Sequence, residues 1–208
     1  MTALELEIVR LQVQVRPLKP GRAPWRVYDP AALQRVWMLA VSADGSVGVD
    51  VDGTEYLDVH NRTHPQTRDR KGRAGISVMA TGDYLALRER YGPHVLDGIA
   101  GESVLVDYAP GLAGRPMPES VSVRGPDGDP LTLAGVHIAE PCVEFSRFCL
   151  RLPPSDRVGD DVTTALADLG GGARGYKMAA VGTGRIRVGD VLLIGPLIDT
   201  AGSGSTCC

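Results

Sequence analysis

The thiol of Cys142 is the side chain best placed for chemistry in this chain. It follows Pro141, and Arg147 comes five residues later in the run Glu140-Pro-Cys-Val-Glu-Phe-Ser-Arg147. Proline lacks a backbone N–H and fixes its own φ, so Pro141 is expected to interrupt a strand ladder and hold Cys142 at a defined angle. A nearby cation favours the thiolate, the form that attacks electrophiles and binds soft metals. The alternative is plain packing, because free cysteine is among the most buried residue types.

A basic loop, His60-Asn-Arg-Thr-His-Pro-Gln-Thr-Arg-Asp-Arg-Lys-Gly-Arg73, is the strongest charged feature. Five of its fourteen residues are Arg or Lys, and two are His. Arginine forks bind phosphate bidentately, so Arg68 and Arg73 are candidates for an anion site near Cys142. The alternative is a solvated surface loop. A zinc site is disfavoured, because Pro65 breaks the helix that a His60/His64 pair would need and no cysteine or carboxylate pair with ligand spacing accompanies it.

Three stretches of the chain resemble the MOSC domain, which is named for the C-terminal domain of molybdenum cofactor sulfurases. Glu140-Pro-Cys142, after the apolar opening Leu133-Ala-Gly-Val136, resembles the family signature. Asp97-Gly-Ile-Ala-Gly-Glu-Ser-Val-Leu-Val106 is similar to its glycine–glutamate turn, with Ser103 in place of the usual asparagine. Arg185-Ile-Arg-Val-Gly-Asp-Val-Leu-Leu193 is similar to its closing strand.

The resemblance covers roughly residues 37–195. It implies a mainly β protein, a MOSC-type β-barrel of the pyruvate-kinase-barrel-like kind. In the family, the cysteine carries sulfur as a persulfide or ligates molybdenum, so the resemblance implies one of two roles for Cys142: the catalytic thiol or a molybdenum ligand. The ligand it implies is a molybdopterin-type cofactor or a sulfur-bearing small molecule. Together with the basic loop and the cation near Cys142, it gives these candidate ligand-binding residues: His64, Thr67, Arg68, Arg73, Arg147 and Arg174.

Composition places the chain among ordinary globular proteins. It has 208 residues, 43% hydrophobic and 23% charged, which predicts one domain over residues 1–200. A net charge of −3 argues against a nucleic-acid partner. No stretch reaches the length of a transmembrane helix, and residues 1–7 lack the pattern of a signal peptide, so a cytoplasmic protein without a membrane partner is expected.

The four cysteines do not form a secreted disulfide framework. Cys142 and Cys149 are seven residues apart, so a continuous strand would send their side chains to opposite faces. Cys207 and Cys208 follow Ala201-Gly-Ser-Gly-Ser-Thr206, whose composition is that of a flexible linker. Residues 201–208 are therefore expected to be a disordered tail that takes no part in the chemistry.

Many short strands with few helices are expected, which is typical of a closed or nearly closed barrel. Asp44-Gly45 and Asp52-Gly53 predict tight turns, and residues 58–75 predict a long loop. Helices are predicted at 81–91, with Thr81 as N-cap, and at 162–169. Strands are predicted at the remaining apolar stretches: 5–16, 33–41, 47–51, 104–107, 121–124, 131–138, 143–150, 176–181 and 185–194, the last two as a pair.

Two other function classes stay open beside sulfur carriage or molybdenum ligation. One is a molybdenum-dependent reductase of N-hydroxylated small molecules, which would need a redox partner; the other is a non-catalytic binding barrel in which Cys142 is only packed. Whether the chain is an enzyme, and which sulfur donor or redox partner it would use, stays undecided at this point. Pyridoxal phosphate is not expected as a cofactor of this chain.

Overall fold

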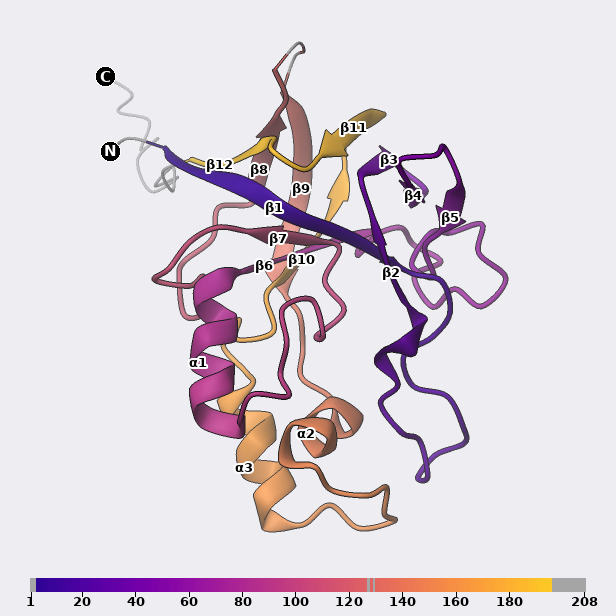
Figure 1. Cartoon of the computed structure of the whole chain (residues 1–208), viewed down its shortest axis with the longest axis vertical. Coiled ribbons are helices and arrows are strands. Elements are labelled where there is room, and N and C mark those ends of the chain that lie inside the picture. The colour runs from indigo at the N-terminus through magenta and orange to yellow at the C-terminus, as the bar shows by residue number, and fades with distance from the viewer. Residues whose placement is uncertain (1–2, 127, 129, 196–208) are drawn as a thin grey trace, which may run out of the picture.

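The computed structural model describes residues 3–126, 128 and 130–195, which form a strand-rich half and a helical half (Figure 1). The elements, in chain order, are β1 (Leu4–Gln14), a 3-10 turn (Pro30–Ala32), β2 (Leu33–Val36), β3 (Met38–Ser42), β4 (Gly45–Val49), β5 (Glu55–Leu57), β6 (Ile76–Ala80), α1 (Thr81–Tyr91), β7 (Val104–Val106), β8 (Ser120–Arg124), β9 (Leu131–Ile138), α2 (Val143–Leu150), α3 (Asp160–Asp168), β10 (Tyr176–Ala180), β11 (Gly184–Arg187) and β12 (Val191–Ile194).

Seven strands close into a barrel in the order β12-β8-β9-β10-β6-β7-β1, and β1 pairs back onto β12. The β6–β7 pair is parallel and the other pairs are antiparallel. β1 is long enough to pair with β12 through its first half and with β7 and β2 through its second half. This closed arrangement confirms the predicted mainly β barrel.

A smaller sheet, in the order β11-β3-β4-β5, packs beside β1. Its close approach requires a glycine: a Cβ on Gly48 would lie 2.8 Å from Val36 Cγ1 and 3.0 Å from Val13 Cγ1. The two predicted tight turns are confirmed as the β3–β4 and β4–β5 connections. The predicted strand 33–41 is divided at Trp37, which is 50% exposed, so that β2 pairs with β1 and β3 belongs to the smaller sheet.

Alternating side chains of the barrel strands fill two cores. Val78 and Val104 point into the barrel, whereas their neighbours Met79 and Leu105 point outward into a second core under the helices. Cys149 belongs to this second core, together with Phe145 of the same helix. The barrel wall is therefore buried on both faces where the helices cover it.

The predicted helix over 81–91 is confirmed, although its N-cap is Ala80 rather than Thr81. The carboxylate of Asp83 accepts the Ala80 N–H at 2.9 Å, and the Thr81 hydroxyl instead donates to Asp107 at 3.0 Å. The second predicted helix is confirmed as α3.

The predicted strand 143–150 is wrong, because this segment is the helix α2. Its aromatic and β-branched residues suit a strand, but its buried residues Phe145, Ser146 and Cys149 recur at helical spacing. Cys142 and Cys149 therefore do not point to opposite faces of a strand. Both are free thiols, and α2 separates them by two turns.

The predicted final strand pair is also wrong. Gly189, at φ 92°, divides residues 185–194 into β11 and β12. β11 pairs with β3 and β12 closes the barrel, while β10 pairs with β6 and β9. The predicted tail, 201–208 with Cys207 and Cys208, lies outside the described residues. Within the described part, no helix is long and apolar enough to cross a membrane.

Candidate functional site

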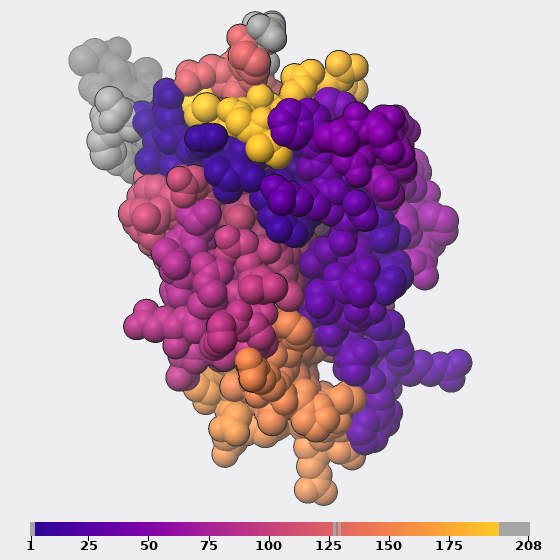
Figure 2. All heavy atoms as spheres, in the orientation of Figure 1, coloured from indigo at the N-terminus to yellow at the C-terminus, as the bar shows by residue number. Residues whose placement is uncertain are grey.

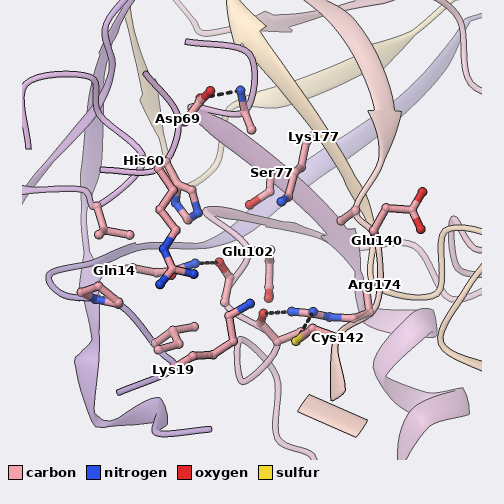
Figure 3. A pocket seen from close by; sticks show the side chains of 18 of the residues that line it. Gln14, Lys19, His60, Asp69, Ser77, Glu102, Glu140, Cys142, Arg174 and Lys177 are labelled. Carbon is pink, nitrogen blue, oxygen red and sulfur yellow. Dashed lines mark hydrogen bonds between the residues drawn. The ribbon is translucent and has the colours of Figure 1, made fainter. Parts of the chain in front are cut away.

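An open cavity of about 330 Å³, here called the Cys142 cavity, lies between the end of β1, the 58–75 loop and the start of α2 (Figure 3). Its volume is within the range of small-molecule sites, about 300–1,000 Å³. The side chains that carry its chemistry come from six separate segments and are Gln14, Lys19, Tyr28, His60, Arg68, Asp69, Ser77, Glu102, Glu140, Cys142, Arg174 and Lys177.

Cys142 reaches this cavity because it stands at the N-cap of α2. The strand β9 ends at Ile138, and the extended backbone of Cys142, at φ −136° and ψ 152°, turns the chain into the helix. Its carbonyl accepts the Ser146 N–H and hydroxyl, both at 3.0 Å, so the thiol stays free to face the cavity. The N-terminus of a helix favours a negative charge, such as that of an anionic ligand.

Arg174 is the cation beside this thiol. Its Nη1 lies 3.6 Å from the Sγ of Cys142, and its Nη2 donates to the carbonyl of Ala100 at 2.7 Å (Figure 3). The guanidinium also lies 4.3 Å above the centre of the Phe145 ring, a cation–π contact. The following Gly175 has φ 77°, and a side chain there would collide with the Val78 carbonyl, so glycine is required for this turn.

Further cations line the cavity around a smaller number of acids. Lys19, Arg68 and Lys177 join Arg174. Burial, together with the positive charges of Arg174 and Lys19, lowers the pKa of Lys177. The Asp69 carboxylate already accepts the backbone N–H groups of two residues in its own loop, at 2.9 and 2.7 Å. The cations therefore repel one another, and an anionic ligand would relieve that repulsion.

A buried acid, Glu102, forms part of the cavity wall. It is 4% exposed, and one carboxylate oxygen accepts the Tyr84 hydroxyl at 2.6 Å. Its other oxygen, Oε1, is buried and has no hydrogen-bond partner among the described residues. Burial raises the pKa of Glu102 to about 7, so this carboxyl group can gain or lose a proton near neutral pH.

Two glutamines of β1 hold the turn that carries Glu102. The side chain of Gln12 donates to the carbonyls of Gly98 and Glu102 at 2.6 and 2.7 Å. Gln14 donates to the carbonyl of Gly101 at 2.7 Å. Because β1 is central to the barrel, the barrel fixes the position of Glu102.

The structure brings together three of the predicted site residues, Cys142, Arg68 and Arg174. His64, Thr67 and Arg73 do not line the cavity, and His64 instead accepts the Gln66 N–H within its own loop at 3.0 Å. Arg147 does not contact the thiol either. It is 4% exposed and donates to the carbonyl of Arg157 at 2.7 Å, because α2 turns it away from its own N-cap.

Sequence reasoning missed Lys19, Tyr28, Glu102 and Lys177 as cavity residues. The sequence did contain a signal that could have identified Glu102 as a cavity residue, because Glu102 lies in the glycine–glutamate turn. Lys177 had a weaker one, as a cation between the apolar residues of β10. Lys19 and Tyr28 lie in irregular chain, where only the tertiary fold determines which way they face.

Comparison with solved structures identifies the architecture. The YuaD protein from Bacillus subtilis has a TM-score of 0.53 and 13% identity, over 92% of this chain and 96% of that chain. YiiM from Escherichia coli has a TM-score of 0.51 and 11% identity, over 96% of this chain and 72% of that chain. At this level of identity, both likenesses are of the fold alone. The fold is a MOSC-type β-barrel. No family model and no curated protein matches the sequence.

The chemistry of the donor set fits a molybdopterin-type cofactor. Arg68, Arg174, Lys19 and Lys177 would hold the anionic part of such a molecule, and Cys142 offers one soft ligand. The Nε of Arg174 is buried without a partner among the described residues, so this guanidinium has unused donor capacity at the cavity wall.

Proposed function

We propose that this MOSC-type barrel binds an anionic, sulfur- or molybdenum-bearing small molecule in the Cys142 cavity and uses Cys142 as its reactive thiol. The observation that supports the proposal most is the contact of 3.6 Å between the Cys142 thiol and the Arg174 guanidinium. It puts a thiolate-stabilising cation at the one cysteine, among the described residues, that lines the cavity.

The protein residues divide the work as follows. Arg174 holds a negative charge on the thiol, and Lys19, Arg68 and Lys177 hold the anionic part of the ligand. Glu102, with its pKa near neutral, accepts or returns a proton inside the cavity. When bound, a molybdenum cofactor would supply a soft metal centre for oxygen-atom or sulfur chemistry.

Sulfur carriage needs no metal and no net oxidant. The thiolate of Cys142 attacks the outer sulfur of a persulfide donor, a new S–S bond forms, and the donor's own S–S bond breaks. The donor leaves as a thiolate, and Cys142 holds the transferred sulfur as a persulfide. The sulfur acceptor then takes that atom and returns Cys142 to the thiolate.

The test is to purify wild type, Cys142→Ser and Cys149→Ser from a host that makes molybdenum cofactor. Molybdenum would be measured by mass spectrometry of the metal, and persulfide sulfur by cyanolysis after incubation with a persulfide donor. We expect wild type and Cys149→Ser to hold molybdenum or persulfide and Cys142→Ser to hold neither. Wild type without either signal would favour a non-catalytic binding barrel.

A further inference from the structure

A second cavity, of about 230 Å³, lies on the other side of Tyr28 and is called here the Arg147 cavity. Tyr28 lines both cavities, so its ring forms part of the wall between them. The second cavity lies between the loop that precedes the 3-10 turn and the helix α2 with the segment after it. In the space-filling view, an opening separates the indigo N-terminal part from the orange part that holds α2 (Figure 2).

Three arginines line this cavity: Arg26, Arg147 and Arg151. Arg147 is the most buried, at 4% exposed, and it has no carboxylate within 4.0 Å among the residues that the structure describes. Its hydrogen bond to the Arg157 carbonyl uses Nη2. A buried cation without a counter-charge costs stability, so this position is unfavourable unless an anion joins it.

The other two arginines add to this excess of positive charge. Arg151 is the left-handed C-cap of α2, four residues after Arg147, and it lines the same cavity. Arg26 has one weak acidic partner, with its Nη1 4.0 Å from Glu144, and its buried Nε has no partner among the described residues. The cavity lining therefore holds three arginines and one carboxylate, that of Glu144, which leaves an excess of two positive charges.

Neighbouring side chains hold Arg151 in place. Its Nε donates to Nδ1 of His94 at 3.2 Å, and Nε2 of the same ring lies 3.2 Å from the Phe148 carbonyl. With Nδ1 as acceptor and Nε2 as donor, the imidazole is neutral and adds no charge to the cavity. The ring of Phe148 lies 5.3 Å from that of Tyr28, so the cavity also has an apolar, aromatic wall.

We propose that the Arg147 cavity is a binding site for a phosphate monoester with an aromatic or other apolar body. A phosphate monoester carries about two negative charges at neutral pH, which matches the two excess positive charges. Three arginines in the lining of one cavity suit a phosphate group, because each guanidinium can donate to a phosphate oxygen. The body of the ester would lie against the ring of Phe148.

The test is a titration of the full chain with phenyl phosphate, followed by NMR of the backbone amides and by calorimetry. We expect the largest shifts in residues 144–157 and not in the 58–75 loop. Arg26→Gln and Arg151→Asn should each weaken binding about tenfold or more, the effect of one lost hydrogen bond to a charged group. Asparagine suits position 151, which has φ 55°.

Two matched variants keep the test specific. Arg157→Gln removes an exposed arginine that does not line the cavity, and Arg68→Gln removes one from the Cys142 cavity; both should retain wild-type affinity. Inorganic phosphate should bind about tenfold more weakly, because it lacks a body to bury. Three results would overturn the site. Arg157→Gln could weaken binding as much as Arg26→Gln and Arg151→Asn do, or only Arg68→Gln could abolish binding. The third result is a wild-type protein that does not bind phenyl phosphate. Equal affinity for phenyl phosphate and inorganic phosphate would contradict the proposed contact between the body of the ester and Phe148.

Discussion

Arg174 and Cys142 come from segments 32 residues apart, yet the guanidinium Nη1 lies 3.6 Å from the thiol. The same guanidinium stacks on Phe145, one turn into the helix that Cys142 caps. Helix α2 therefore positions both the thiol and the cation. This shared support is why the pair should behave as one functional unit.

Arg174→Met should slow the alkylation of Cys142 about fivefold near neutral pH, because the thiolate loses roughly 1 kcal/mol of favourable interaction. The measurement is the labelling rate of the Cys142 peptide under limiting iodoacetamide. Arg185→Met is the control, since it removes an exposed arginine on β11. An unchanged rate in Arg174→Met, with the variant folded, would show that the contact does not activate the thiol.

Glu102 should make the protein less stable as the pH rises from about 4.5 to about 7. Its pKa is raised by burial from an ordinary 4.5 to about 7 in the folded state, so over that window the unfolded chain loses this proton first. The contribution, about 3 kcal/mol, is complete below pH 4.5 and lost once the pH passes 7.

The measurement is urea unfolding of wild type, Glu102→Gln and Glu140→Gln at several pH values between 4.5 and 8. Glu102→Gln should remove this part of the pH dependence, because its amide stays neutral. Glu140 is exposed at the same cavity and serves as the matched carboxylate. If the free energy of unfolding changed with pH in the same way in all three proteins, the raised pKa of Glu102 would be contradicted.

Much of the barrel could be predicted from the sequence because local patterns specify it. The apolar stretch over 131–138 and the turn residues at Asp44-Gly45 and Asp52-Gly53 match the observed β9 and hairpins. Helix α2 could not be predicted, because eight residues with two Phe and one Val fit a strand or a helix equally. Its helical state follows from packing Phe145 and Cys149 into the second core.

The residues of the Cys142 cavity could also be predicted only in part from the sequence. A post-proline cysteine could be identified from the sequence, but its cationic partner could not. Arg147 is close in sequence, yet the helix turns it away, whereas Arg174 reaches the thiol through a glycine turn that only the tertiary fold places there. Sequence distance is therefore a poor guide to which arginine stabilises a thiolate.

Arg68 and Arg73 should differ in their effect on ligand binding, although both belong to the basic loop. Arg68 lines the Cys142 cavity and Arg73 does not. Arg68→Gln should reduce stabilisation by a pterin phosphate by about 1.5–3 kcal/mol, the value of a hydrogen bond to a charged group. Arg73→Gln should leave it unchanged. Thermal melting with and without ligand measures this, and equal stabilisation in the two variants would leave the loop as solvated surface.

Serine substitutions should separate the two cysteines by their structural cost. Cys142→Ser should change the free energy of unfolding by less than about 0.5 kcal/mol, because the side chain is partly exposed at a cavity. Cys149→Ser should cost about 1–3 kcal/mol, because it puts a hydroxyl into the apolar second core. Urea unfolding measures both. A larger loss for Cys142→Ser would indicate that this thiol is a packing element.

The most direct measurement compares the two thiols in the folded wild-type protein. Burial raises the pKa of Cys149 to about 12 and leaves it 1% exposed, whereas Cys142 lines the cavity beside Arg174. Under limiting iodoacetamide, read peptide by peptide with the Cys207 and Cys208 peptide set aside, Cys142 should be labelled first and Cys149 only after denaturation. Labelling of Cys149 before Cys142, with Cys142 protected until the protein unfolds, would contradict a reactive thiol at this cavity.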